Sequence, residues 1–226
     1  MTEPARDALL TAAGVEHAFG VRDMREPEGI CRPRQVHGVG IVSGRSCAGD
    51  RFPDGDGVVS SDPGRRVGVV TADCVPLLLA TGDLRAVAAV HAGWRGLAAG
   101  VVAAGVQALC AESGSAPGDL IVAVGPHIGV CCYEVDEPVL KSLGARFPTD
   151  LQGALRSASR PGHAMLDLAQ LVRDDLYHCG LQPTNISGMT QGCTFCEVDR
   201  FYSYRREGPR SGRLLHFIAA GTGSQG

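Results

Sequence analysis

Continuous short runs of apolar residues, bounded by glycine, proline and aspartate, dominate the middle of the chain. Three of these runs are Val67–Thr71, Val75–Ala80 and Val87–His91. A strand that is covered on both faces has such a continuous pattern, whereas a half-exposed strand alternates. Thr81-Gly82-Asp83 provides a turn between the second and third runs. The pattern therefore predicts three buried strands in close succession.

The apolar period changes from that of a strand to that of a helix after Trp94. Apolar residues at 97, 101, 104, 108 and 109 fall on one side of a helix, which Gly114 and Pro117 would end. Weaker patterns predict helices at Ala5–Ala13, Glu137–Leu143 and Leu166–Tyr177. They also predict strands at Val36–Ser43 and Leu120–Val124, and extended segments at Asn185–Ser187, Phe201–Arg205 and Leu214–Ala219. Strands and helices mix without a long linker, so we expect one α/β domain over residues 1–226.

Composition narrows the class of protein. Hydrophobic residues make up 44% and charged residues 20% of the 226 positions, which is typical of a globular chain. The formal charge is 21 − 24 = −3, so no bulk positive field would attract nucleic acid or an acidic membrane. The apolar stretch from Ala86 to Cys110 contains Arg95, which a membrane helix would have to bury. A buried strand followed by a buried helix is the better interpretation.

The cysteines favour a reducing compartment. There are nine, an odd number, and the N-terminus shows no basic region followed by an apolar stretch. We therefore expect a cytoplasmic protein without structural disulfides. Cys193 and Cys196 have the spacing of a redox pair or of half a zinc site, and Cys131 and Cys132 are adjacent. Neighbouring cysteines chelate one ion awkwardly, so packing is the preferred interpretation for all four.

Three segments place a possible metal ligand at or near the end of a predicted strand, where α/β proteins build sites. The segments are RQVHG, TADCVP and VHAGWRG, and the ligands are His37, Cys74 and His91. Two imidazoles and a thiolate suit Zn²⁺ and leave a fourth position open. Taken alone, Cys74 would more often be a small buried hydrophobic residue. Asp54-Gly-Asp56-Gly resembles the opening of a calcium loop but lacks its later ligands, so it indicates a hairpin-like turn.

Six segments together resemble the laccase-domain family, whose members have been called polyphenol oxidase, purine nucleoside phosphorylase and peptidoglycan editing factor. They are RQVHG, TADCVPLLLA, VHAGWRG, VGPHIGVCCYEV, CTFCEVDRFYSYRREG and GRLLHFIA. The resemblance implies a sandwich of two mixed β-sheets flanked by helices, like the catalytic domain of a deamidating toxin. It also implies a catalytic zinc at His37, Cys74 and His91. Family members have a longer N-terminal stretch, so residues 1–33 are a shortened segment, and His127 and Val130 depart from the family pattern.

The activity implied by the resemblance is phosphorolysis of purine nucleosides, including 5′-methylthioadenosine, together with adenosine deamination. An open zinc position suits hydrolytic chemistry because zinc lowers the pKa of bound water to about 7. Glu134 or Asp73 would be the proton shuttle in deamination. Arg95 and Arg205 would bind phosphate, since arginine forks match its oxygens. Purine nucleosides and phosphate are therefore the expected partners, and the sequence leaves both a monomer and a dimer open.

Three alternatives belong to other classes of function. Multicopper oxidase chemistry is disfavoured, because it uses roughly ten histidines in His-x-His pairs, whereas this chain has seven, none within two residues of another. Copper as a substitute for zinc would explain weak polyphenol oxidase activity. The second alternative is a non-enzymatic or partner-dependent zinc protein in peptidoglycan maintenance. The third is a hydrolase with Cys74 as nucleophile.

Overall fold

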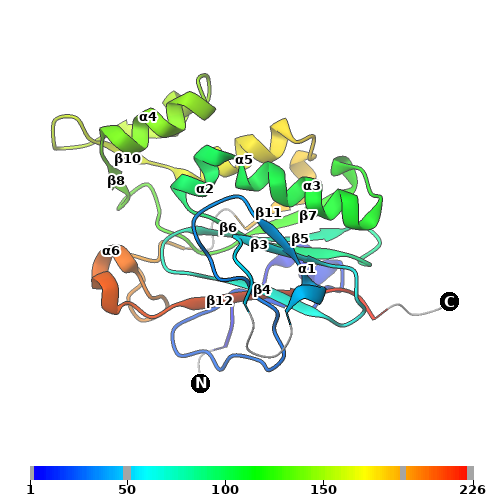
Figure 1. Cartoon of the computed structure of the whole chain (residues 1–226). Coiled ribbons are helices and arrows are strands. Elements are labelled where there is room, and N and C mark those ends of the chain that lie inside the picture. Colours follow the sequence, from blue (N-terminus) through cyan, green and yellow to red (C-terminus); the bar gives the residue numbers. More distant parts are fainter. Residues whose placement is uncertain (1–2, 48–51, 189–191, 223–226) are drawn as a thin grey trace.

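The computed structural model of the chain describes residues 3–47, 52–188 and 192–222 (Figure 1). The helices are α1 (Ala8–Ala12), α2 (Trp94–Ala99), α3 (Val101–Ser113), α4 (Glu137–Arg146), α5 (Leu168–His178) and α6 (Tyr204–Glu207). The strands are β1 (His17–Ala18), β2 (Ile41–Ser43), β3 (Gly57–Ser60), β4 (Arg66–Thr71), β5 (Val75–Thr81), β6 (Val87–Ala92), β7 (Leu120–Val124), β8 (Glu134–Val135), β9 (Leu155–Ser157), β10 (Ala164–Leu166), β11 (Ile186–Ser187) and β12 (Leu214–Ala219).

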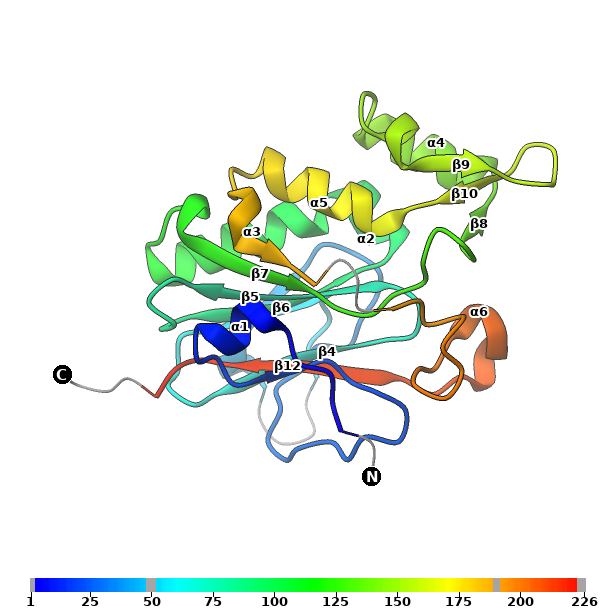
Figure 2. The same cartoon turned by 180° about the vertical axis from the view of Figure 1, so that it is seen from behind.

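A mixed six-stranded sheet forms the centre of the molecule, in the order β11-β7-β5-β6-β3-β2. Its two outer pairs are parallel and its inner pairs are antiparallel. A three-stranded antiparallel sheet, β1-β12-β4, packs against one face, and helices α2, α3 and α5 cover the other face (Figures 1 and 2). The predicted class, a mixed α/β single domain with packed sheets flanked by helices, is confirmed.

Strand β5 shows why the central runs are continuously apolar. Val75, Leu77 and Leu79 point into the core between the six-stranded sheet and the helices. Leu78 and Ala80 point into the second core, between the two sheets. Because side chains alternate between the faces of a strand, two buried faces require apolar residues at every position. The predicted strands over β4, β5, β6 and β7 are confirmed for this reason.

A small antiparallel sheet, β8-β10-β9, lies with α4 at one side of the main body (Figures 1 and 2). Helix α4 packs against α2, which joins this lobe to the helical layer. The loop that leads from the central sheet into the lobe includes Tyr133 and the adjacent pair Cys131 and Cys132. The lobe therefore extends the molecule beyond the edge of the central sheet.

Three predicted elements differ in the structure. The helix predicted after Trp94 is divided into α2 and α3 at Gly100, whose φ of 96° ends the first helix. Residues 36–40 of the predicted strand over 36–43 form a loop instead, and only β2 is extended. The predicted alternation over 201–205 is wrong from Tyr204 onwards, because Ser203 caps the short helix α6 by accepting a hydrogen bond from the Arg206 N–H.

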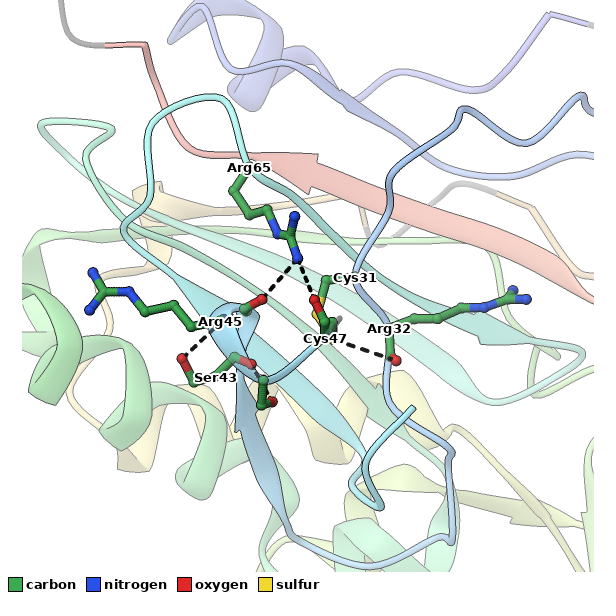
Figure 3. Close-up of a disulfide and its surroundings, with 8 residues drawn as sticks. Cys31, Arg32, Ser43, Arg45, Cys47 and Arg65 are labelled. Atoms are coloured by element: carbon green, nitrogen blue, oxygen red, sulfur yellow. Dashed lines mark hydrogen bonds between the residues drawn. A yellow bond between two sulfur atoms is a disulfide. The ribbon is translucent and has the colours of Figure 1, made fainter. Parts of the chain in front are cut away.

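The expectation that the chain has no structural disulfide is also wrong. Cys31 and Cys47 are joined by a disulfide, with Cα atoms 5.4 Å apart (Figure 3). Arg65 lies beside it and donates hydrogen bonds to the backbone oxygens of Gly44 and Cys47. The other seven cysteines are free. An odd count is compatible with one bridge, so the cysteines do not identify the compartment.

Membrane insertion has no support in the helices of the structure. Over residues 3–47, 52–188 and 192–222, none of the helices combines the length and the apolar character needed to cross a bilayer. The apolar stretch around Arg95 divides between β6 and the two helices that follow it. This division agrees with the sequence-based interpretation of that stretch as a strand followed by a helix.

Candidate metal centre and active-site cavity

The structure brings His37, Cys74 and His91 together. Each offers one ligand atom, and the three atoms lie within 4.8 Å of one another. Cys74 directly precedes β5 and His91 lies near the end of β6, and these strands are paired so that Val75 faces Ala92. His37 comes from the loop before β2. Pairing of β5 with β6 therefore places two of the donors, and the loop supplies the third.

Asp56 holds both histidines in position. Its carboxylate is fully buried and accepts a hydrogen bond from Nδ1 of His91 at 2.8 Å. It also accepts the backbone N–H groups of Val36, His37 and Gly38, at 3.3, 2.9 and 2.6 Å. One carboxylate thus folds the loop that carries His37 and leaves Nε2 of His91 for the cluster. Carboxylates orient metal-binding histidines in this way.

The cluster is strongly polarised. Burial raises the pKa of the Cys74 thiol, but hydrogen bonds with His37 and His91 outweigh burial and lower this pKa to about 6. Burial lowers the pKa of His91, but hydrogen bonds with Asp56 and Cys74 raise it to about 9. Burial raises the pKa of Asp56, and its hydrogen bonds with His91, Gly38 and His37 bring it below the usual value. Cys74 is therefore held as a thiolate at neutral pH.

Gly93 leaves the space between the three donors free. A Cβ atom at this position would lie 3.0 Å from Sγ of Cys74 and 3.2 Å from Cδ2 of His37. The separate loop that carries His37 is tightly wound, since His37 has a φ of 59°. Two imidazoles and a thiolate, with a buried carboxylate behind one imidazole, match the donors that Zn²⁺ prefers. The residues present therefore fit a zinc ion with one position left for water or substrate.

A cavity of about 980 Å³ opens above the three donors. Five arginines line it: Arg32, Arg34, Arg95, Arg205 and Arg213. Four aromatic residues line it as well: Phe52, Trp94, Tyr133 and Tyr204. The chain as a whole carries a formal charge of −3, so these arginines make the cavity a local cationic region. Such a cavity combines planar apolar surfaces with donors for an anion.

The arginines differ in how they are engaged. Arg34 forms a two-pronged ion pair with Asp54, at 2.6 and 2.7 Å. Arg95 stacks on the Trp94 ring at 4.4 Å, and Arg205 lies 5.3 Å from the centre of the Tyr133 ring. Within the described part of the chain, neither Arg95 nor Arg205 pairs with a carboxylate through its guanidinium group. Arg205 donates one hydrogen bond to the Glu134 carbonyl at 2.8 Å, and its other guanidinium N–H groups and those of Arg95 can bind an anionic ligand.

The two proposed proton shuttles lie in different places. Glu134 forms an ion pair with Arg160 at 2.9 Å and is not among the residues that line the cavity. Asp73 does line the cavity, and its carboxylate accepts hydrogen bonds from the Thr194 hydroxyl and the Arg205 backbone N–H, at 2.7 and 2.6 Å. Of the two carboxylates, Asp73 therefore lines the cavity and Glu134 does not.

Sequence reasoning missed two parts of this region. The sequence predicts a turn at Asp56 and gives no local sign of its role, because the N–H groups that it accepts belong to Val36, His37 and Gly38, 18 to 20 positions earlier. The sequence predicts a packing role for Cys131, Cys132, Cys193 and Cys196, but the structure gathers them into one cluster, with all four sulfur atoms within 4.8 Å of one another. Although Cys131 and Cys132 are adjacent in the chain, both lie close to Cys193 and Cys196.

Comparison with known families identifies the chain. The sequence model of the family described as multi-copper polyphenol oxidoreductase laccase matches residues 13–221. The chain belongs to this family. The match extends from the end of α1 to just beyond β12, and it includes all three donors and the residues that line the cavity. The resemblance inferred from the six sequence segments is confirmed.

Several relatives carry the name purine nucleoside phosphorylase. The chain is 36% identical over 192 residues to purine nucleoside phosphorylase YlmD of Geobacillus stearothermophilus, covering 81% of this chain and 69% of that protein. It is 38% identical to purine nucleoside phosphorylase PA4543 of Pseudomonas aeruginosa, covering 83% and 74%. It is 31% identical to human purine nucleoside phosphorylase LACC1, covering 76% of this chain and 40% of that protein.

Solved structures share the fold. The crystal structure of YlmD from Geobacillus stearothermophilus superposes with a TM-score of 0.77 at 33% identity, covering 86% of this chain and 74% of that one. The crystal structure of the hypothetical protein YfiH from Bacillus licheniformis superposes with a TM-score of 0.80 at 25% identity, covering 91% and 92%. The arrangement of packed sheets and helices is therefore shared with this family.

Proposed function

We propose that this protein is a zinc-dependent purine nucleoside phosphorylase. The observation that carries the proposal is the convergence, in one cavity, of the His37–Cys74–His91 cluster with arginines and aromatic rings. The names of the relatives point to the same reaction. In this reaction a phosphate oxygen bonds to C1′ of the ribose and the bond from C1′ to the purine breaks. The purine takes a proton, and the products are a free base and ribose 1-phosphate.

The arginines account for the phosphate. Arg95 and Arg205 line the cavity and have no carboxylate on their guanidinium groups among the described residues. A doubly charged phosphate would bind between such forks through charge-assisted hydrogen bonds. Holding phosphate next to the ribose also supplies the proximity that a two-substrate reaction needs. We therefore assign phosphate binding to Arg95 and Arg205.

The aromatic residues account for the purine. Tyr133 and Trp94 line the same cavity as the cluster, and flat rings of this kind stack on a base. When bound by His37, Cys74 and His91, zinc supplies a Lewis acid that polarises oxygen atoms of the ligand or water. The chain's own residues would then orient the nucleoside, and Asp73 is one of the two carboxylates that line the cavity.

Two further activities are proposed for the same cavity: phosphorolysis of 5′-methylthioadenosine and deamination of adenosine. Both need a purine held at the cluster, and deamination also needs a carboxylate to move protons. Asp73 occupies the cavity, whereas Glu134 is bound to Arg160. We therefore assign the proton transfer of deamination to Asp73 in preference to Glu134. Asp73→Asn is expected to lower deamination more than phosphorolysis.

The proposal is tested with zinc-loaded protein and four nucleosides, adenosine, inosine, guanosine and 5′-methylthioadenosine, each with and without phosphate. We expect phosphate-dependent release of free base and sugar 1-phosphate from at least one of them. Arg205→Ala is expected to raise the KM for phosphate by about tenfold with a smaller effect on the KM for nucleoside. Arg85→Ala, which changes an exposed arginine in a distant turn, is the control.

Failure of base release with all four nucleosides would overturn the enzyme proposal and favour the non-enzymatic, partner-dependent zinc protein. Chelation distinguishes zinc-dependent catalysis from catalysis by a Cys74 nucleophile, because a thiol nucleophile needs no metal. We expect activity to disappear on chelation and to return with zinc. Oxidation of phenols by zinc-loaded, copper-free protein would instead support the polyphenol oxidase alternative.

A further inference from the structure

The four-cysteine cluster lies in two backbone turns that are far apart in the sequence. Cys131 and Cys132 belong to a turn in which the Cys132 N–H donates to the Gly129 carbonyl at 3.0 Å. Cys193 and Cys196 belong to a second turn, in which the Cys196 N–H donates to the Cys193 carbonyl at 3.1 Å. The four sulfur atoms lie within 4.8 Å of one another. The two turns therefore face each other with all their thiols on the shared side.

The spacing of the sulfur atoms agrees with a tetrathiolate metal site. Sγ of Cys196 lies 3.8 Å from Sγ of Cys131 and 3.3 Å from Sγ of Cys132. In a tetrahedral zinc site with Zn–S bonds of about 2.3 Å, neighbouring sulfur atoms are about 3.8 Å apart. Small movements of the side chains would bring all four to this distance. The adjacent pair fits as well, because the turn directs both thiols towards Cys196.

The surroundings of the cluster also suit a bound cation. The Gly129 N–H donates a hydrogen bond to Sγ of Cys193 at 3.2 Å, and such hydrogen bonds stabilise thiolate ligands of metals. Cys131 and Cys196 are exposed, whereas Cys132 and Cys193 are partly buried. An ion can therefore enter from solvent and be held against the protein on its inner side.

We propose that Cys131, Cys132, Cys193 and Cys196 bind one Zn²⁺ in a structural site that is separate from the cavity cluster. Four protein ligands complete the coordination of zinc and leave no position for a substrate, which is the arrangement of structural sites. The proposal does not depend on the phosphorylase reaction, because it rests on a different set of residues.

The site would fasten one wall of the cavity. Thr194, between two of the cysteines, donates its hydroxyl to Asp73 at 2.7 Å and its N–H to the His127 carbonyl at 2.9 Å. Arg206, in α6, donates to the carbonyls of Thr194 and Phe195 at 2.8 and 2.7 Å. The other turn leads directly to Tyr133, which lines the cavity. A zinc ion between the turns would join these contacts into one rigid wall.

The test counts zinc in protein purified under reducing conditions. We expect about two zinc ions per chain in the wild type and about one in the triple variant His37→Ala, Cys74→Ala, His91→Ala. The double variant Cys132→Ser, Cys196→Ser is expected to lose the other ion. Cys110→Ser with Cys179→Ser, which alters two free cysteines outside both clusters, is the matched control and should keep both ions.

A second measurement avoids substitutions in the cysteine cluster. Co²⁺ added to the metal-free triple variant should give strong thiolate-to-metal charge-transfer absorption, saturating at one equivalent, and Zn²⁺ should displace it. Absence of this absorption, or a triple variant that binds no zinc, would overturn the proposal. Disulfides among these four cysteines in protein purified under reducing conditions and saturated with zinc would overturn it too. None of these results would bear on phosphate-dependent base release by the wild type, so the two proposals fail separately.

Discussion

The cavity cluster (His37, Cys74, His91) and the cysteine cluster (Cys131, Cys132, Cys193, Cys196) are both groups of possible metal donors, but they are built differently. The cavity cluster has three donors of two kinds, and a buried carboxylate orients one of them. It also faces a cavity of about 980 Å³. The cysteine cluster has four identical donors, all in turns, and two of them are exposed.

The two proposed zinc ions would serve different purposes. Three donors with space in front of them leave a coordination position for a reacting ligand, whereas four donors close the coordination sphere. Organisation differs as well, since Asp56 fixes the cavity cluster through hydrogen bonds before any metal arrives. The cysteine cluster would gain its rigidity from the ion. Substitutions around the cavity cluster should therefore affect chemistry, and loss of the cysteine cluster should chiefly affect stability.

The largest effect on stability is expected from the disulfide that tethers the His37 loop. Cys31→Ser with Cys47→Ser opens a loop with a sequence separation of 16 residues, which contains His37. Removing a cross-link of this span costs about 3 kcal/mol through the entropy of the unfolded chain. Chemical denaturation should show this loss, and Cys110→Ser should not. An unchanged free energy of unfolding would show that the tether does not contribute.

Asp56→Asn tests whether the buried carboxylate organises the cavity cluster. The variant loses the charge that holds His91 and the three backbone N–H groups of the His37 loop. We expect zinc affinity at the cavity cluster to fall by about 10- to 100-fold. Competition with a chelator measures this, with Asp150→Asn as the control. Unchanged zinc affinity would show that Asp56 does not organise the cavity cluster.

Gly93→Ala tests the space between the donors. The added Cβ would lie 3.0 Å from Sγ of Cys74 and 3.2 Å from Cδ2 of His37, so the donors must shift by a few tenths of an ångström. We expect kcat to fall by about tenfold, because catalytic geometry tolerates little displacement. The control is Gly153→Ala, where an added Cβ meets no atom within 4 Å. Equal activity of both variants would contradict the tight geometry.

The last prediction concerns acid and His216, a buried residue outside both clusters. His216 is fully buried, its Nδ1 accepts the Gly20 N–H, and its Nε2 faces the Thr71 hydroxyl. Burial, and to a lesser extent the charge of His91, lower the pKa of His216 to about 3. As pH falls below about 6.5, His216 becomes protonated in the unfolded chain but stays neutral in the folded protein.

Stability should therefore be unaffected by His216 above pH 6.5 and should fall below it, by up to about 1.4 kcal/mol per pH unit. His17 and His127, whose pKa values burial also lowers, act in the same direction. Denaturation between pH 7 and pH 5 would measure the slope, and His216→Asn should make it shallower. A slope that is the same in the variant would contradict the assignment.

Much of the fold follows from local patterns, because β4, β5 and β6 are continuous apolar runs with a donor at or near the end of two of them. Features that depend on distant partners could not be predicted in this way. Asp56 acts on His91, 35 positions away, and Cys131 meets Cys196 across 65 positions. The pairing of Cys31 with Cys47 likewise depends on where the loop folds back, which an odd count of cysteines does not reveal.

The contrast between the two clusters is tested most directly by measuring phosphorolysis and zinc content together in Cys74→Ala and in Cys196→Ser, with saturating nucleoside and phosphate. The account predicts that each variant loses about one zinc ion. Cys74→Ala should fall to background activity, and Cys196→Ser should keep kcat within about tenfold of the wild type while unfolding at a lower temperature. Phosphorolysis that persists in Cys74→Ala and disappears in Cys196→Ser would contradict the assignment of the chemistry to the cavity cluster.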